Sequence, residues 1–193
     1  MRRKAFTLVE LLVVIAIIGL LSTIAVVALG STRVNARNIQ RKANLVQISK
    51  ALELYYANFG AYPSTGGSSN WHGACSVYNS YPDVDTLNAS PTSCNDLSAP
   101  SWIPGLTSCG FMAKLPRDPN TSKGNTSNGS PAYCGTAGQN CYVYTSTGTD
   151  YKLIANCIPE GTLSASDPFA DPGAGGARLP YAWAVWSSGA STW

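Results

Sequence analysis

Residues 4–29 read KAFTLVELLVVIAIIGLLSTIAVVAL, and this stretch decides how the rest of the chain is organised. Residues 8–29 form an apolar run of 22 residues that contains a single charged side chain, Glu10. As an α-helix rising ~1.5 Å per residue, such a run is roughly 33 Å long, which is enough to cross a bilayer. A cleaved secretory signal has a shorter apolar core of ~7–15 residues. The run therefore predicts a membrane-spanning helix that the mature protein keeps.

The carboxylate of Glu10 is the unusual feature of this run. A charged side chain inside a membrane helix costs ~2.5–3.5 kcal/mol on insertion scales, so it normally has a partner and a function. No lysine, arginine or histidine lies within residues 6–29 to neutralise it. The simplest source of the missing cation is an α-amino group created by cleavage just upstream.

A basic leader at residues 2–4, the motif Phe-Thr-Leu-Val-Glu at residues 6–10 and the apolar run together resemble the class III signal of type IV prepilins and type II secretion pseudopilins. The resemblance implies that a membrane peptidase cuts between Ala5 and Phe6 and that Phe6 becomes N-methylated. It also implies that Glu10 pairs with the terminal amine of a neighbouring subunit. Two features depart from the family pattern: Ala5 replaces the usual glycine, and the first proline is Pro63.

The segment after the apolar run continues as a helix. Residues 31–59 contain neither proline nor glycine, and apolar side chains recur at three- and four-residue steps: Leu45, Ile48, Leu52, Tyr55 or Tyr56, and Phe59. This period predicts an amphipathic helix packed on a sheet. Gly60 and Pro63 predict where it ends. The expected division is a leader at 1–5, a membrane or filament-core helix at 6–29, an amphipathic helix at 30–59 and a globular head at 60–193.

The clearest strand signal lies in residues 141–157. Two runs rich in tyrosine and β-branched residues, 142–145 and 151–155, are joined by residues 146–150 and predict an antiparallel hairpin. Together with the Leu-Pro-Arg-Asp-Pro segment at 115–119, their order resembles pseudopilin heads. The predicted fold class is α+β, with one long N-terminal helix on a small antiparallel sheet, the lollipop of pilins. Residues 61–140 are predicted to be mainly loops, and the tail 179–193 has no counterpart in the resemblance.

All six cysteines lie beyond residue 60, which predicts disulfides formed in an oxidising compartment. The alternatives are zinc binding or free thiols in the core, and zinc is disfavoured because there is no C-x-x-C motif and only one histidine. Six cysteines allow 15 pairings. Cys141 and Cys157 flank the predicted hairpin and are the candidate bridge, with Cys134–Cys141 as the alternative.

Charge and motifs exclude several classes of function. Residues 1–5 carry a net charge of +3, whereas residues 60–193 carry −3, so a nucleic-acid-binding head is not expected. A Ser/His/Asp hydrolase would have to use His72, which we expect to be a surface histidine without a nucleophile motif beside it. The chain is therefore not expected to be an enzyme.

No cofactor is expected, although calcium has to be considered. Pseudopilin heads sometimes bind calcium, and Asp118 and Asp150 match that pattern loosely, since calcium prefers oxygen ligands. The alternative is that both aspartates stabilise turns. Asp167 and Asp171 are expected to lie in a solvated loop.

These features favour a structural subunit of a type IV pilus or type II secretion-like filament. The precursor would be a single-pass protein of the cell membrane with a cytoplasmic N-terminus and an external head, and the filament would be periplasmic or extracellular. The expected partners are copies of itself or related pilins, the prepilin peptidase and the membrane. The alternative is a membrane-anchored extracellular binding domain that does not polymerise. The sequence does not separate a major pilin from a minor pilin, pseudopilin or competence pilin.

Overall fold

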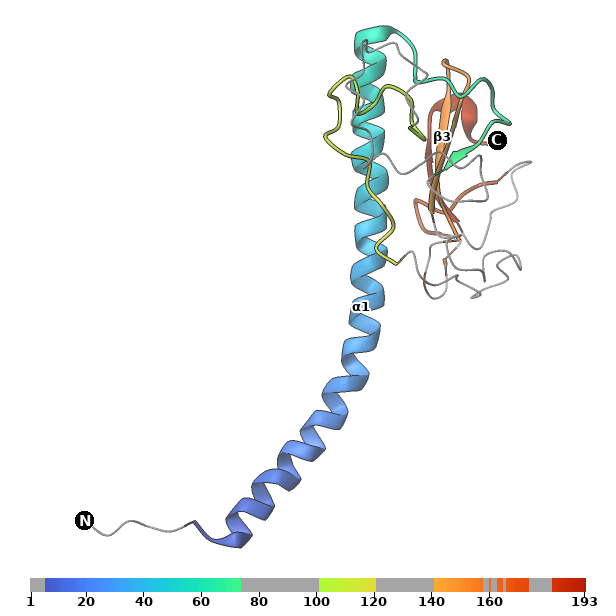
Figure 1. The fold of residues 1–193 in the computed structure, drawn as a ribbon. Coiled ribbons are helices and arrows are strands. Elements are labelled where there is room, and N and C mark those ends of the chain that lie inside the picture. The colour runs from blue at the N-terminus through green and yellow to red at the C-terminus, as the bar shows by residue number, and fades with distance from the viewer. Residues whose placement is uncertain are drawn as a thin grey trace. The chain divides into compact units, whose positions relative to one another are not determined.

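The computed structural model describes residues 6–73, 101–120, 141–157, 160, 163–164, 166–173 and 182–193. The chain divides into two compact units, Met1–Ala36 and Arg37–Trp193. Its elements follow the order α1 (Leu8–Phe59), β1 (His72–Gly73), β2 (Cys141–Ser146), β3 (Tyr151–Asn156), β4 (Ala182–Trp186) and a short 3-10 helix, η4 (Ser188–Ala190) (Figure 1).

Helix α1 ends where the sequence predicted. Gly60 has a φ of 71°, and its N–H donates to the carbonyl of Tyr56 over 2.7 Å. This left-handed glycine immediately after the helix satisfies one of the carbonyls that the last turn leaves unpaired. The predicted end of the helix at Phe59 is therefore confirmed, with its local physical cause.

The sheet has four strands in the order β1-β2-β3-β4, and all neighbours are antiparallel. Strands β2 and β3 pair from Cys141 opposite Asn156 to Ser146 opposite Tyr151. This register confirms the predicted hairpin. Gly148, at a φ of 93°, supplies the left-handed residue of the connecting turn.

Two strands were not predicted. Strand β1 lies in the segment that we expected to be loops and pairs with β2 at only two positions. Strand β4 lies in the tail 179–193, for which the resemblance to pseudopilin heads offered no counterpart, and it pairs along β3. Both strands are short and contain glycine or alanine, so they lack the run of β-branched residues that identifies a strand in sequence.

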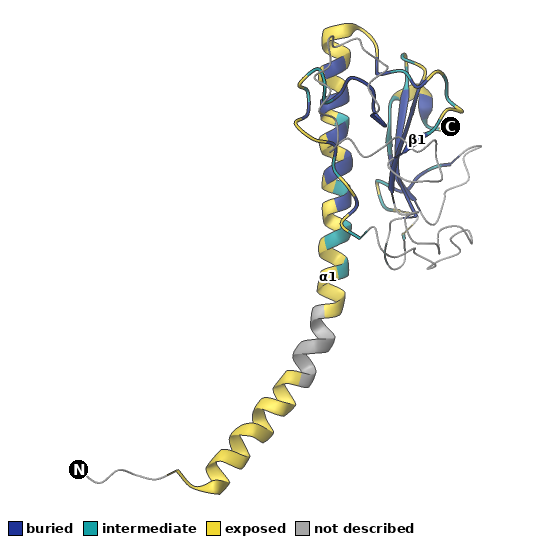
Figure 2. Cartoon of the chain, viewed as in Figure 1, coloured by how far each residue is buried: buried dark blue, intermediate teal, exposed yellow. Residues whose placement is uncertain are grey.

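The main core lies between the head half of α1 and one face of the sheet (Figure 2). Leu45, Ile48 and Leu52 are fully buried there, which confirms the predicted apolar stripe. Phe59 is an exception, because 42% of its surface stays exposed at the end of the helix. Residues 101–115 also contribute buried side chains to this core: Trp102, Ile103, Leu106, Met112 and Leu115.

A second, smaller cluster covers the opposite face of the sheet. Val143, Ile154 and Ala184 are its buried centre, and Trp71 and Trp186 pack against it. Because both faces are covered, every residue of β2 and β3 is buried. Such strands read as continuous β-rich runs without a clean alternation of polar and apolar side chains.

Three expectations about single residues were wrong. His72 is buried, with only 7% of its surface exposed, and lies in the edge strand β1, where it pairs with Tyr144 of β2. Asp171 is fully buried, since it forms an ion pair of 2.8 Å with the buried Lys152 of β3. Asp167 is half-buried, and its carboxylate accepts a hydrogen bond from Lys42 on α1.

Candidate assembly site

Residues 6–22 of the N-terminal unit are all exposed (Figure 2), and most of them are large apolar residues. Phe6 and Leu8 are about four-fifths exposed, at 80% and 79%, and most of the large apolar residues up to Leu21 are at least half exposed. A helix of a soluble domain covers one apolar face and leaves a polar one. Exposure on all sides instead marks a surface that another apolar phase or molecule covers. Among the described residues, no helix satisfies the combined length and apolarity that a membrane crossing requires.

Glu10 and Thr7 form a capping box at the start of α1. The backbone N–H of Glu10 donates to Thr7 Oγ1 over 3.2 Å, and the backbone N–H of Thr7 donates to Glu10 Oε2 over 2.8 Å. The Thr7 hydroxyl donates to the same Oε2 over 2.9 Å. This reciprocal pattern satisfies two N–H groups that the first turn would leave unpaired. It holds the carboxylate at the positive end of the helix dipole, on the backbone N–H of Thr7, the residue that follows Phe6.

The position of the carboxylate bears on its predicted role. Both hydrogen bonds from Thr7 go to Oε2, and among the described residues Oε1 accepts none. One oxygen therefore has lone pairs available for a further donor. Phe6 is the first described residue, and Ala5 lies outside the described residues. Cleavage at Ala5, methylation of Phe6 and pairing of Glu10 with a neighbour stay predictions.

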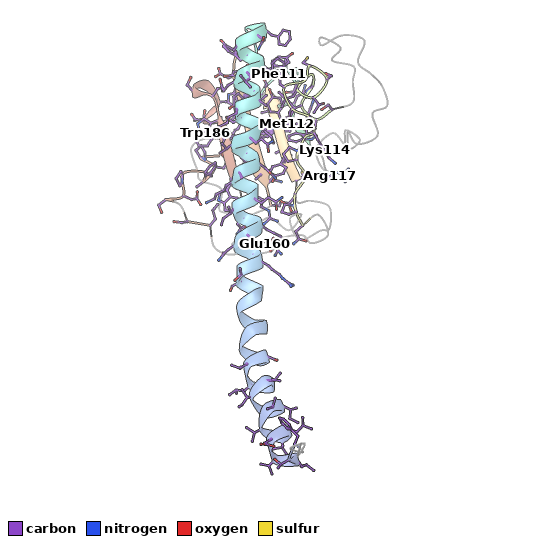
Figure 3. All side chains as sticks on the ribbon, turned by 90° about the vertical axis from the view of Figure 1, so that its left-hand side faces the viewer. Phe111, Met112, Lys114, Arg117, Glu160 and Trp186 are labelled. Atoms are coloured by element: carbon purple, nitrogen blue, oxygen red, sulfur yellow. The ribbon has the colours of Figure 1, made fainter. Side chains whose placement is uncertain are left out.

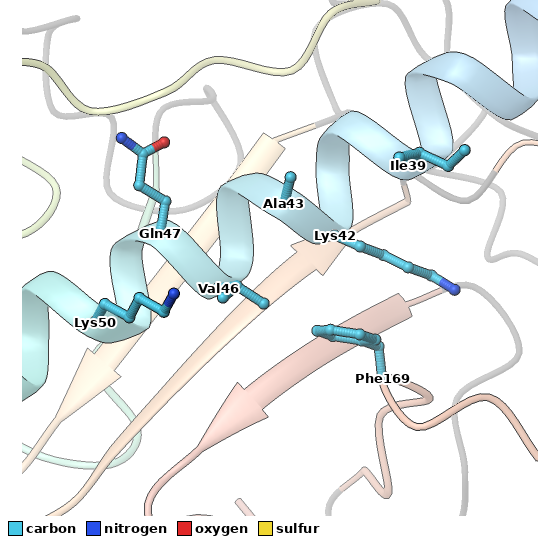
Figure 4. Close-up of a pocket in the computed structure, with 7 residues that line it drawn as sticks. All are labelled: Ile39, Lys42, Ala43, Val46, Gln47, Lys50 and Phe169. Atoms are coloured by element: carbon cyan, nitrogen blue, oxygen red, sulfur yellow. The ribbon is translucent and has the colours of Figure 1, made fainter.

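Within the head unit, a shallow groove of about 460 Å³ runs along the outer face of α1 (Figure 4). Apolar carbon dominates its lining, and Ile39 is 69% exposed and Val46 36% exposed. Phe169, from the loop before β4, forms the opposite wall in Figure 4. The remaining lining residues are all on α1: Lys42, Ala43, Gln47 and Lys50.

Lys42 fixes the loop that supplies this wall. Its Nζ lies 2.5 Å from Asp167 Oδ2, 4.7 Å from the ring centroid of Trp183 and 5.6 Å from that of Phe169. An ion pair combined with two cation–π contacts restrains the lysine and the loop together. Lys42 and Asp167, whose ion pair holds this loop against α1, are 125 positions apart in the chain.

An ionic cluster joins α1 to two further segments of the head. The Arg41 guanidinium, fully buried, contacts the carboxylates of Asp118 and Glu160. Arg37 also pairs with Glu160, whose position beside α1 is visible in Figure 3. Hydrogen bonds from Arg37 and then from Arg41 lower the pKa of Glu160 to about 2. Because Arg41 and Asp118 are fully buried, this cluster is part of the head's framework.

The two aspartates considered as calcium ligands, Asp118 and Asp150, both accept hydrogen bonds from other residues of the head. Both carboxylate oxygens of Asp118 accept hydrogen bonds from Arg41. Asp150 Oδ1 accepts hydrogen bonds from the Ser187 hydroxyl and the Gly189 N–H. Within the described residues, no three or more histidine, cysteine or acidic side chains gather as a metal site would need.

Cys141 and Cys157 are both disulfide-bonded. The predicted bridge between them, and the alternative with Cys134, stay predictions. Cys75, Cys94 and Cys134 lie outside the described residues.

Sequence reasoning missed Thr7 and Arg41 as functional or framework residues. For Thr7 a signal was present, since threonine followed three positions later by glutamate is the capping-box pattern. For Arg41 no local signal exists, because its partner Asp118 is 77 positions away.

Comparison with known proteins identifies the class of this N-terminal segment. Residues 1–26 match the family described as "Prokaryotic N-terminal methylation motif". The chain therefore carries a prepilin-type N-terminal segment, and the predicted resemblance is confirmed there.

The chain is also similar to one particular protein of known class. The chain is 34% identical over 64 residues to "Type II secretion system core protein G" of Pectobacterium carotovorum subsp. carotovorum. The match covers 33% of this chain and 41% of the relative, so it spans less than half of that protein's length. No solved structure matches this chain.

Proposed function

We propose that this chain is a structural subunit of a type IV pilus or type II secretion-like filament, a pilin or pseudopilin, and acts without catalysis. The observation that carries the proposal is the exposed apolar segment 6–22 with its single capped glutamate, inside the matched methylation motif. A folded protein cannot leave such a surface in water, so a membrane or a neighbouring subunit must cover it.

The membrane covers this segment first. The precursor would span the cell membrane with its leader in the cytoplasm and its head outside, the orientation that the leader's resemblance to prepilins implies. The peptidase would then cut between Ala5 and Phe6, and the methylated amine of Phe6 would remain as a cation. The capping box supports this step, because it keeps the Glu10 carboxylate beside the start of the helix, where such an amine of a neighbour is needed.

Copies of the chain cover the segment next. We infer that the apolar segment 6–22 of one subunit packs against α1 of others, including the outer groove with Ile39, Val46 and Phe169. The two surfaces differ, so their contact is heterologous, and a heterologous contact that does not close into a ring produces an open helical filament. The alternative, an anchored binding domain, would need the segment only as an anchor and gives the groove no role.

Mass spectrometry of the mature N-terminus tests the proposal. Protein sheared from the cell surface or extracted from membranes should begin with N-methylated Phe6 and lack residues 1–5. A strain without the prepilin peptidase is the control and should yield only the full precursor. An intact Met1 terminus in the assembled material would contradict the proposal.

A further inference from the structure

The loop between β2 and β3 is fastened to the segment that follows β4. Asp150 Oδ1 accepts a hydrogen bond from the Ser187 hydroxyl over 2.6 Å and one from the Gly189 N–H over 3.0 Å. The Ser187 hydroxyl oxygen in turn accepts from the N–H of Tyr151 over 2.9 Å, and the N–H of Ser187 donates to the carbonyl of Tyr151 over 3.1 Å. One serine thus bonds both to the loop and to the first residue of β3.

The fit at Gly189 is close. A Cβ atom at position 189 would overlap the Asp150 carboxylate, so any residue other than glycine would displace the carboxylate from its hydrogen bonds. The neighbouring Lys152 makes a second attachment, because its Nζ donates to the carbonyl of Trp193 over 2.7 Å and pairs with Asp171 over 2.8 Å. Residues 187–193 therefore attach at two successive points of the hairpin.

Asp150 and Asp118 do not fit calcium in this arrangement. Calcium takes six to eight oxygen ligands that direct lone pairs at the ion. Asp150 Oδ1 instead faces an N–H and an O–H donor, whose hydrogens would repel a cation at that place. Asp118 faces the buried guanidinium of Arg41 with both oxygens, so a cation there would meet like charge.

We propose that the hydrogen bonds from Ser187 and Gly189 to Asp150 hold the β2–β3 loop to the C-terminal segment, and that no metal ion takes part. We call this set of hydrogen bonds the clasp. Oδ1 of the Asp150 carboxylate is satisfied by two donors of the same chain, and the tail 187–193 acquires a defined role as the second half of the clasp. The inference concerns the head alone and stands whether or not the chain forms filaments.

Thermal unfolding of the full chain in detergent tests the clasp, with calcium chloride or EDTA as the only variable. The wild type should have the same Tm in both. Ser187→Ala removes two hydrogen bonds and should lower the Tm by about 3–8 °C in both buffers. The matched control is Ser188→Ala, an exposed serine one position on, which should keep the wild-type Tm.

Asp150→Asn distinguishes hydrogen bonding by the Asp150 side chain from calcium binding by its carboxylate. Its amide oxygen still accepts from Ser187 and Gly189, so the clasp predicts a smaller loss of Tm than for Asp150→Ala. A rise in the wild-type Tm with calcium that Asp150→Asn abolishes would overturn the proposal. A Tm for Ser187→Ala equal to that of Ser188→Ala would overturn it as well.

A double-mutant cycle provides a second measurement. Gly189→Ala should lower the Tm strongly in the wild type but only slightly in the Asp150→Ala background, because the atoms that the new methyl group meets are then absent. Equal losses in both backgrounds would mean that Gly189 does not act through Asp150.

Discussion

Arg41 and Asp118 form a bidentate ion pair in which both side chains are fully buried. Arg41 Nε lies 2.6 Å from Asp118 Oδ2, and Nη2 lies 2.9 Å from Oδ1. The pair joins the middle of α1 to the Leu-Pro-Arg-Asp-Pro segment 115–119, and Glu160 adds a third charged group. The geometry is the planar fork that arginine offers and lysine lacks.

Breaking one side of this pair should destabilise the head strongly. Asp118→Ala leaves a buried guanidinium with too little compensating charge, which typically costs ~3–5 kcal/mol. For a chain of this size that corresponds to a fall in Tm of roughly 6–20 °C, measured by thermal unfolding. Arg41→Lys should also lower the Tm, because lysine cannot reproduce both bonds.

The double variant Arg41→Met/Asp118→Leu is the control for this prediction. Replacing both charges with apolar groups leaves no unpaired buried ion, so it should cost less than Asp118→Ala alone. If the double variant lost as much as the two single variants added together, the two residues would not act as a pair.

The stability of the head should depend on pH through Glu160. The pKa of this carboxyl is lowered to about 2 from an ordinary value of 4.5, first by the hydrogen bond from Arg37. A carboxyl with a lowered folded-state pKa stabilises the fold above its unfolded pKa, and this contribution is lost as the pH falls through the folded-state value. The loss should therefore occur between about pH 4.5 and pH 2.

The measurement is the Tm as a function of pH in the wild type and in Glu160→Gln. Other carboxyls titrate in the same range, so the difference between the two curves is the readout. Glu160→Gln should be less stable than the wild type at pH 6, and the two curves should converge toward pH 2. Parallel curves throughout this range would contradict the assignment.

Glu10→Gln should separate capping from subunit pairing. Glutamine serves at the third position of a capping box as glutamate does, so α1 should start normally and the protein should insert and be cleaved. Loss of one side of a charge pair typically costs ~3–5 kcal/mol, and ~1.4 kcal/mol is tenfold, so filament yield should fall by roughly 100-fold or more. Glu10→Asp should keep part of the yield. The readout is the amount of subunit in sheared filaments relative to the membrane pool.

Thr7→Ala is the matched control for Glu10→Gln. It removes the threonine side of the cap but keeps the charge, with an expected cost of only ~1 kcal/mol to the helix end. Its defect in assembly should be clearly milder. Normal filament yield in Glu10→Gln would rule out the charge-pair role of this residue.

Ala43→Glu tests the groove. A charge among Ile39, Val46 and Phe169 should reduce assembly, since covering an unpaired carboxylate with an apolar helix is costly. Because Ala43 is exposed in the single chain, the Tm of the unassembled protein should stay unchanged. Ala57→Glu makes the same change at another exposed alanine of α1 outside the groove, and it should assemble normally. Equal filament yields from the two variants would show that the groove takes no part in assembly.

The sequence by itself determined those features that depend on neighbouring residues. The apolar run, the leader motif and the end of α1 at Gly60 are local, because the hydrophobic period and a left-handed glycine act within a few residues. The β2–β3 hairpin is local in the same sense: its two β-rich runs are joined by a short turn that contains Gly148. These were the elements that could be predicted.

Only the tertiary structure decided which polar groups are buried and with what. Arg41 and Asp118, Lys152 and Asp171, and Asp150 and Ser187 are each brought together by the fold from separate segments. Strand β4 pairs along the edge of β3, and the buried His72 lies in β1, which pairs with β2 from a distant segment. In each case the free energy of burial depends on a partner far along the chain, and no local pattern of residues records where that partner will lie.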